Sequence, residues 1–250
     1  FYISNDAFHI NDRYVRLSKI GSVKMAEKLR FEGKIMSATV SRQADQWFVS
    51  IAVETNLEKK CGNESIGVDL GIKTLATLST GETVKNNKPL KKNLEKLKTL
   101  QRKHSRKIKG SNNRKKSLMR LARLHLRISN QRKDTLHKLT TGLCARAKRI
   151  TIEDLNVSGM MKNHRFAQAI SDVGLGEFRR QLEYKSKIYG NEIVVADRWF
   201  PSSKTCSGCG KIKTELGLET RTYICDCGIS IDRDLNAAIN LNNYGGLHRK

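Results

Sequence analysis

The chain has 250 residues, a hydrophobic content of 38% and a formal net charge of +24. Its length suffices for a buried core, and its composition excludes a disordered chain. No apolar run approaches the roughly 18 residues that cross a bilayer, and no signal-peptide pattern opens the chain. We therefore expect a cytoplasmic protein with no membrane partner. Because its first residue is Phe1, we also expect it to be a piece of a longer protein.

The first 55 residues are predicted to form β structure. The stretches KIMSATVS and QWFVSIAVE flank residues 42–45, a pattern that is typical of a hairpin from a small sheet or barrel. Along the second stretch Trp47, Val49, Ile51 and Val53 alternate with other residues, so we expect them to share one face.

Residues 65–84 (SIGVDLGIKTLATLSTGETV) predict two or three short antiparallel strands. Gly71 marks the first expected turn, and Thr80 with Gly81 marks the second.

Positive charge is concentrated between Lys88 and Arg149, where 22 Lys and Arg residues oppose two acids. This segment carries a net charge of +20, and the rest of the chain carries only +4. A solvated helical face usually mixes both signs, whereas a nearly acid-free segment repels itself unless a polyanion neutralises it. We therefore predict nucleic acid as the partner, with Lys115, Lys116 and Arg120 among its contacts. An anionic membrane surface is the weaker alternative.

Two long antiparallel helices are predicted within this basic segment. Pro89 suits the first position of a helix, and KGSNNRKK is a polar break between the two. Leucines recur at helical spacing, which predicts apolar seams that face each other and cationic faces that point outward. These leucines are Leu90, Leu94, Leu97, Leu100, Leu118, Leu121, Leu136, Leu139 and Leu143.

Strands and helices alternate in the remainder of the chain. RITIEDL predicts a short strand with Ile150 and Ile152 on its buried side, and a helix is predicted to end at Gly190. The apolar run in NEIVVADRW is typical of a strand covered on both faces. A last helix begins at about Asp232, so the order of elements predicts a mixed α/β sheet.

Four cysteines are spaced as ligands of a structural zinc ion. Cys206 and Cys209 form a C-x2-C pair, and after fifteen intervening residues Cys225 and Cys227 form a C-x-C pair. Residues two apart on an extended strand project to one side, so the second pair can present both sulfurs to one metal. The alternative is two disulfides or inert thiols, but a reducing cytoplasm favours zinc.

Three acids are candidate ligands for a hard metal ion. Asp69 lies within an apolar strand, where a charge is costly unless something pairs with it. Glu153 ends the strand RITIE, and Asp234 lies at the start of the last helix. Each acid alone is a weak signal, since an aspartate at a helix start is more often a cap. Together with the cationic segment, they predict Mg²⁺-dependent hydrolysis of phosphodiesters.

Of the two aspartates in DRD, we assign the metal ligand to Asp234 and the helix cap to Asp232. On a helix that begins here, Asp234 shares its face with Ala237, Ala238 and Leu241. That face is small and apolar, so it can pack closely on the sheet that carries the first acid. Asp232 precedes it at the position where a carboxylate accepts the first free N–H groups.

The motifs GVDLGIKTLATLSTGE, ITIEDL, DRWFPSSKTCSGCG and DRDLNAAINL resemble those of OrfB-type insertion-sequence proteins, known as TnpB, in order and spacing. These proteins are relatives of the type V CRISPR effector nucleases. The resemblance covers roughly residues 1–245 and implies an α/β fold with an RNase H-like (RuvC) mixed sheet. It places the catalytic triad on Asp69, Glu153 and Asp234. The family's N-terminal part, with the remaining wedge strands and the recognition lobe, is not in this sequence.

The resemblance also implies the cofactors and partners. Mg²⁺ or Mn²⁺ is expected at the three carboxylates, and one structural Zn²⁺ is expected in an inserted zinc ribbon held by the four cysteines. The expected partners are a DNA target and a guide RNA from the transposon end, with no small-molecule substrate.

Six segments follow from this resemblance: a wedge-like β segment, three RuvC-like parts and two insertions between them. Residues 1–58 are expected to form the partial wedge-like segment, 59–87, 149–200 and 231–250 the RuvC-like parts, 88–148 the basic helical pair, and 201–230 the zinc ribbon.

The expected function is therefore a metal-dependent DNA endonuclease of a transposon that is guided by RNA. One alternative is a nucleic-acid-binding accessory or regulatory protein of transposition without cleavage. Another is an unguided RNase H-like transposase or resolvase. A defined RNA that copurifies with the protein would separate guided from unguided enzymes. A small CRISPR effector would share the same sequence features.

Overall fold

The computed structural model describes residues 1–4, 7–55, 60–217 and 219–247. The chain divides into two compact units, one formed by Phe1–Leu57 with Glu95–Arg127 and the other by Glu58–Leu94 with Ile128–Lys250. The expected boundary between residues 58 and 59 lies outside the described residues, and so do the last three positions of the final expected segment.

The first unit begins with two antiparallel sheets of three strands each. One has the order β1-β5-β6, formed by Tyr2–Ser4, Lys34–Gln43 and Gln46–Glu54. The other has the order β2-β3-β4, formed by Phe8–Asn11, Tyr14–Leu17 and Gly21–Lys24. Both sheets contribute to one core of Phe8, Val15, Leu17, Ala38 and Val40. The pairing of β5 with β6 confirms the predicted hairpin.

The residues expected to share one face of this hairpin differ in burial. Val49 and Ile51 pack against the core, but the side chain of Trp47 is 65% exposed. The guanidinium of Arg42 lies 5.5 Å from the centre of its ring. Trp47 lies beside the turn that joins β5 to β6, beyond the residues of the core, and it borders the same hollow as Val49 and Ile51, as expected for residues that share one face.

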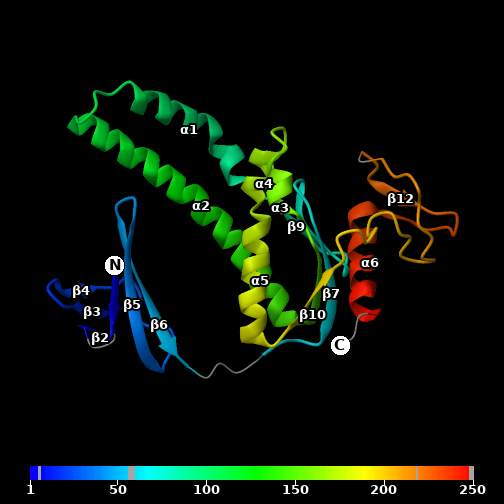
Figure 1. The fold of residues 1–250 in the computed structure, drawn as a ribbon, viewed down its shortest axis with the longest axis horizontal. Coiled ribbons are helices and arrows are strands. Elements are labelled where there is room, and N and C mark those ends of the chain that lie inside the picture. Colours follow the sequence, from blue (N-terminus) through cyan, green and yellow to red (C-terminus); the bar gives the residue numbers. More distant parts are fainter. Residues whose placement is uncertain (5–6, 56–59, 218, 248–250) are drawn as a thin grey trace. The chain divides into compact units, whose positions relative to one another are not determined.

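The two predicted helices are α1 (Pro89–Ser105) and α2 (Asn112–Arg146), and they form an antiparallel hairpin that is visible in Figure 1. Within the first unit, Leu97 and Leu124 are buried. Leu118 was expected in the seam, but its side chain is 53% exposed. The prediction for Leu118 is wrong because the partly buried positions on this part of α2 are Met119, Leu121 and Ala122.

The second unit contains a mixed sheet of five strands in the order β11-β10-β7-β8-β9. The strands are β7 (Glu64–Leu70), β8 (Thr74–Leu78), β9 (Thr83–Lys85), β10 (Ala147–Glu153) and β11 (Glu192–Ala196). β10 runs parallel to both of its neighbours, whereas β7, β8 and β9 pair antiparallel in sequence order. The predicted mixed α/β sheet is confirmed.

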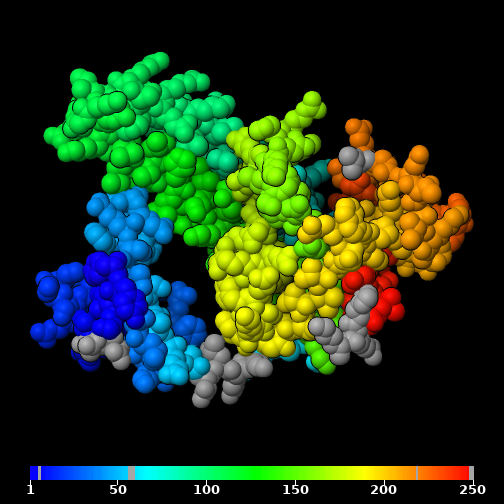
Figure 2. All heavy atoms as spheres, in the orientation of Figure 1, coloured from blue at the N-terminus to red at the C-terminus, as the bar shows by residue number. Residues whose placement is uncertain are grey.

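The two faces of this sheet are covered by different helices. Ile66 and Val68 of β7, with Ile150 and Ile152 of β10, enter the main hydrophobic core. Residues of α2 and α5 (Leu175–Tyr189) complete that core, namely Leu136, Leu139, Leu143, Leu175, Phe178 and Leu182. The last helix, α6 (Arg233–Leu247), lies on the other side of the sheet (Figure 1). In Figure 2, atoms of α5 and of the segment after β11 (yellow to gold) cover much of the sheet from this side.

The strand predicted to be covered on both faces is instead an edge strand. β11 pairs with β10 alone, most of its residues are only partly buried, and Val195 is 37% exposed. The apolar run correctly predicted a strand, but the position of that strand in the sheet depends on pairings with distant residues. The helix before it ends at Gly190, as predicted, with a left-handed φ of 78°.

Short elements complete the second unit: α3 (Val157–Met161), α4 (Ala167–Val173), β12 (Thr222–Ile224) and β13 (Ser230–Asp232). β12 and β13 form an antiparallel hairpin that leads directly into α6. Of the helices in the described part of the chain, none combines the length and the hydropathy needed to cross a bilayer.

Candidate catalytic site and metal centre

Small residues allow α6 to approach the sheet closely. A Cβ atom at Gly67 of β7 would lie 2.0 Å from the backbone oxygen of Ala238, so a side chain cannot be accommodated there. At the other end of the contact, a Cβ atom at Gly245 would lie 2.1 Å from Oγ1 of Thr151. Ala237 is also buried, so the predicted small apolar face of α6 is confirmed. The backbone of α6 therefore lies directly on β7 and β10.

The three candidate acids gather where this helix meets the ends of two strands. The parallel register pairs Ile152 with Val68, so Glu153 and Asp69 follow at neighbouring carboxyl ends. Because side chains alternate along a strand, Asp69 projects to the face opposite Val68, which is the face that α6 covers. Asp234 lies in the first turn of α6. The structure thus places all three predicted acids in one region of the second unit.

The charges of these acids act on one another. Burial raises the pKa of the Asp69 carboxyl well above its ordinary value, and the negative charges of Glu153 and Asp234 raise it further. The positive charge of Arg233 opposes this rise. A cation between the carboxylates would offset both the burial and the repulsion.

The acids are spread more widely than a single compact ligand set. Across residues 1–4, 7–55, 60–217 and 219–247, four cysteines are the one group of three or more His, Cys, Asp or Glu residues with ligand atoms within 4.8 Å of one another. The three acids therefore do not form a cluster as compact as that of the four sulfurs.

The two aspartates of DRD have different environments. Oδ1 of Asp232 accepts hydrogen bonds from the backbone N–H groups of Asp234 at 2.9 Å and Leu235 at 3.1 Å. This geometry confirms the predicted cap at Asp232. The side chain of Asp234 is 28% exposed, and its Oδ1 lies 3.6 Å from Nε of Arg233. The carboxylate of Asp234 is therefore not used as the cap.

A chain of hydrogen bonds that sequence reasoning missed connects α6 with Glu153. The hydroxyl of Ser202 donates to Oε1 of Glu153. Nδ2 of Asn240 in α6 donates to the backbone oxygen of Ser202 at 2.8 Å and to that of Thr205 at 2.6 Å. Nδ2 of Asn236, one turn earlier, donates to the same oxygen of Thr205 at 2.7 Å. Two asparagines four residues apart on the apolar face of DLNAAINL were the signal that could have predicted this link.

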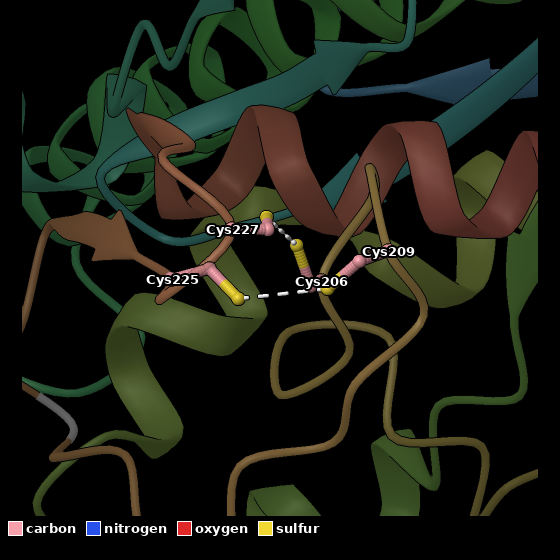
Figure 3. A group of neighbouring side chains, drawn as sticks. All are labelled: Cys206, Cys209, Cys225 and Cys227. Atoms are coloured by element: carbon pink, nitrogen blue, oxygen red, sulfur yellow. Dashed lines mark hydrogen bonds between the residues drawn. The ribbon is translucent and has the colours of Figure 1, made fainter.

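The four cysteines form the second candidate centre, and Figure 3 shows their side chains pointing toward one another from two loops. The Sγ atoms of Cys206 and Cys227 lie 3.6 Å apart, and so do those of Cys209 and Cys225. Disulfide sulfurs are separated by about 2.05 Å, whereas sulfurs around a tetrahedral zinc ion lie roughly 3.8 Å apart. The four thiols are free and lie at a distance at which one metal ion can bind them.

The second cysteine pair reaches this geometry by a different route from the one predicted. Cys225 and Cys227 do not lie on an extended strand but in the turn that joins β12 to β13. The N–H of Cys225 donates to the oxygen of Ile229 at 2.9 Å, and the N–H of Gly228 donates to the oxygen of Cys225 at 3.0 Å. Gly228 has a left-handed φ of 94°. The predicted extended conformation is wrong, because a tight turn brings the two sulfurs to the same side.

The thiols differ in acidity because of their surroundings. The backbone N–H of Cys209 is the main cause that lowers the pKa of Cys206 to about 6. At Cys227 the backbone N–H of Ile229 lowers the pKa, but the neighbouring sulfurs, Cys206 first, outweigh it and raise the pKa to about 12. Four adjacent thiolates would repel one another, so the cluster can lose all its protons only if a cation compensates.

The basic residues predicted to contact nucleic acid lie on α2 within the first unit. Lys115, Lys116 and Arg120 are all exposed. Nearby, Arg123 pairs with Asp45 of the β5-β6 turn at 2.6 Å. The exposed positions are compatible with phosphate contacts, which stay a prediction.

Two family models match the chain. OrfB_IS605, described as "Probable transposase", matches residues 48–164, and the Cas12f1-like TNB domain matches residues 176–241. The second match contains the cysteine cluster and Asp234.

Similar proteins come from several bacteria. A protein of Streptomyces pristinaespiralis is 47% identical over 82% of this chain and 52% of its own length. A protein of Mycobacterium tuberculosis is 34% identical over 93% of this chain and 55% of its own length, and InsQ of Escherichia coli is 33% identical over 90% and 60%. All three carry the provisional name of RNA-guided DNA endonuclease. The chain thus spans somewhat more than half the length of these relatives.

Solved structures support the fold. A CRISPR-Cas12f ternary complex has a TM-score of 0.55 at 21% identity, covering 85% of this chain and 46% of that protein. A Cas12f1-sgRNA-target DNA complex has a TM-score of 0.50 at 19% identity, covering 83% and 57%. The mixed α/β fold of this chain is therefore Cas12f-like.

Proposed function

We propose that the chain is a member of the OrfB-type (TnpB) family of insertion-sequence proteins and that it forms the catalytic part of a metal-dependent, RNA-guided DNA endonuclease. The observation that carries the proposal is the set of three acids on the α6 face of the sheet. Asp69, Glu153 and Asp234 come from three separate segments, and the charges of the other two act on Asp69.

The sheet supports an RNase H-like (RuvC) assignment. Its order places a parallel pair, β10 and β11, beside an antiparallel meander of β7, β8 and β9. The first acid is on the central strand and the second is on its parallel neighbour. The expected RuvC-like parts, 59–87, 149–200 and 231–250, contain α6 and the five strands except for the first two residues of β10.

We assign a divalent metal to the three carboxylates because their donor set suits one. Oxygen ligands are those that Mg²⁺ and Mn²⁺ prefer, and Asp69 is both buried and surrounded by like charge. When bound, such ions would activate a water and stabilise the leaving oxygen of the phosphodiester. Ser202 holds Glu153 in place, and Asp232 serves as the helix cap, so the carboxylate of Asp234 is not used for that purpose.

We assign one structural Zn²⁺ to Cys206, Cys209, Cys225 and Cys227, in a ribbon that corresponds to the expected segment 201–230. Sulfur separations of 3.6 Å support tetrahedral ligation, and the hairpin β12-β13 with buried Tyr223 gives the ribbon a small core. The metal would keep this insertion folded next to the third acid and would take no part in catalysis.

The proposed partners are a DNA target and a guide RNA. The relatives' names support both, and the exposed cations on α2 support contacts with phosphates. Residues 88–148 would serve as the basic helical pair and residues 1–58 as part of a wedge-like segment that contacts the RNA.

An unguided RNase H-like transposase is the second candidate, since the matching family model is described as a transposase. To separate the guided from the unguided enzyme, the full-length parent is expressed with its native flanking DNA, and the RNA that copurifies is sequenced. A defined RNA that directs Mg²⁺-dependent cleavage of a matching DNA supports the guided enzyme. Cleavage that persists after all RNA has been removed supports the unguided enzyme. If the protein cleaves DNA neither with its RNA nor without it, both candidate functions are contradicted.

A further inference from the structure

Trp199 is left in solvent beside the candidate catalytic site. Its side chain is 85% exposed, although a buried indole would contribute a large apolar area to a core. It lies in the segment that follows β11, which also carries Ser202, the hydrogen-bond partner of Glu153.

The residues around Trp199 are anchored, so its exposure does not follow from a loosely held segment. The N–H of Trp199 donates to Oδ1 of Asp197 at 2.8 Å. On one side, Arg198 forms an ion pair with Asp154. On the other side, the ring of Phe200 packs against Tyr244 of α6 with ring centres 4.7 Å apart. The backbone is thus fixed at both neighbours while the indole points outward.

Two hollows meet at this indole. One has a volume of about 390 Å³, and its lining includes Glu153, Trp199 and Lys204. The other has a volume of about 450 Å³, and its lining includes Trp199, Arg179 and Arg198. The indole therefore lies between a space that reaches a candidate catalytic carboxylate and a space bordered by two guanidinium groups.

The guanidinium donors beside this exposed indole favour a ligand with phosphates and flat bases over an apolar protein segment. Arg179 and Arg198 both pair with Asp154, and Arg179 also pairs with Glu183, so these four groups together are neutral. Because a guanidinium has five N–H donors, pairing with a carboxylate still leaves donors for a phosphate. An exposed indole next to cations is the usual platform on which single-stranded nucleic acid stacks a base.

We propose that Trp199 stacks on a nucleobase of a single strand and thereby guides the backbone of that strand toward Glu153. The direction toward Glu153 rests on the proposed nuclease function, whereas the stacking itself does not. Every base has a flat π face, so this platform would bind single strands with little preference for sequence.

The chain offers a direct optical test because it contains two tryptophans, Trp47 and Trp199. In a Trp47→Phe background, Trp199 is the only indole that emits. Oligothymidylates of twelve nucleotides are titrated into this variant without added divalent metal. A matched oligonucleotide with abasic positions serves as the control. We expect the base-bearing strand to quench the fluorescence and to bind roughly tenfold more tightly than the abasic strand.

Variants at Trp199 separate stacking from other roles, with binding measured by anisotropy of a labelled oligonucleotide. In Trp199→Ala the preference for bases over abasic positions should disappear, while Trp199→Phe should keep most of it. Because this side chain is mostly in solvent, truncation should leave the fold intact, which circular dichroism checks. An unchanged preference in Trp199→Ala, or an equal loss for both oligonucleotides, would overturn the proposal.

These outcomes are independent of cleavage. If the chain stacks bases but its full-length parent never cuts DNA, the proposed nuclease function fails and the stacking site stands. If the parent cuts DNA and Trp199→Ala still discriminates bases as the wild type does, the stacking site fails and the nuclease function stands.

Discussion

The cysteine cluster and the carboxylate set both lie in the second unit but are built on opposite principles. The four sulfurs come from two tight turns, and their ligand atoms all lie within 4.8 Å of one another. The three carboxylates come from two strands and a helix, and they stay further apart. A closed set of soft ligands suits a metal that holds the fold, whereas an open set of hard ligands suits a metal that also binds substrate.

Buried side chains of α6 connect these two centres. Asn236 and Asn240 bind the backbone between Ser202 and Ser207, and Ser202 binds Glu153. These hydrogen bonds fix the first turn of the cysteine cluster to α6, the helix that carries Asp234. The rest of the cluster lies outside these contacts and can fold as a local unit. The comparison predicts that damage to the cluster is mainly local, whereas damage to the carboxylates removes chemistry without unfolding the chain.

The largest expected effect is the loss of zinc. Because metal binding to such a cluster is coupled to folding, Cys206→Ser should release the metal and unfold the ribbon, residues 201–230. Elemental analysis should find one zinc per wild-type chain. In Cys206→Ser, the backbone amide of Tyr223 should lose its protection from hydrogen exchange, whereas the amides of β7 should keep theirs. Cys61→Ser is the matched control and should retain zinc. Zinc-free wild-type protein with all four thiols in disulfides would contradict the assignment.

The next largest effect concerns the cleavage rate of the full-length parent, which should respond differently to substitutions at the two aspartates of DRD. Asp234→Asn should lower metal-dependent cleavage by about 10³-fold, as the loss of several kcal/mol of transition-state stabilisation implies. Asp232→Asn should keep most of the activity, because asparagine caps a helix about as well as aspartate. A reversed pattern in the two cleavage rates would move the ligand to Asp232.

A smaller effect is expected at Ser202, which positions Glu153 without contacting the reacting atoms. Residues that orient a metal ligand commonly contribute 10- to 100-fold, so Ser202→Ala should weaken metal binding or cleavage by about tenfold. Higher Mn²⁺ concentration should restore part of the rate, and Ser202→Thr, which keeps a hydroxyl, should recover more. Equal rates in wild type and Ser202→Ala at limiting metal would show that the hydrogen bond has no part in catalysis.

How far the sequence predicts the structure also differs between the two centres. The spacing of Cys206 and Cys209 is a local signal, so the cluster could be predicted, although the turn at Cys227 was not. The carboxylates could be predicted as candidates because each lies at or near the end of a periodic element. Ser202 was missed because its partner is 49 residues away, and such a contact leaves no trace in local periodicity.

Tertiary context also explains the remaining errors. Helix and strand identities follow local patterns, so Pro89 correctly marked the start of α1 and Gly190 the end of α5. Which side of an element is buried depends on its distant neighbours instead. Leu118 is apolar, as core residues are, but it lies on the exposed side of its helix, and β11 lies at an edge of its sheet.

The smallest expected effect concerns stability in the absence of divalent metal. The pKa of Asp69 is raised in the folded chain, so stability from this group is complete below its unfolded pKa and is lost as the pH rises through the folded value. At pH 7 Asp69→Asn should therefore unfold at a higher urea concentration than wild type. The gain should shrink toward pH 4. A loss of stability at pH 7 would show that the carboxylate is already compensated.

The most direct measurement is the binding of Mn²⁺ to the zinc-loaded chain, followed by electron paramagnetic resonance. Wild type and Asp232→Asn should bind Mn²⁺ with similar affinity, whereas Asp69→Asn, Glu153→Gln and Asp234→Asn should each weaken binding by at least about tenfold, which is the usual range for altered metal sites. Equal Mn²⁺ binding in all five proteins would contradict the assignment of these three acids as a metal site.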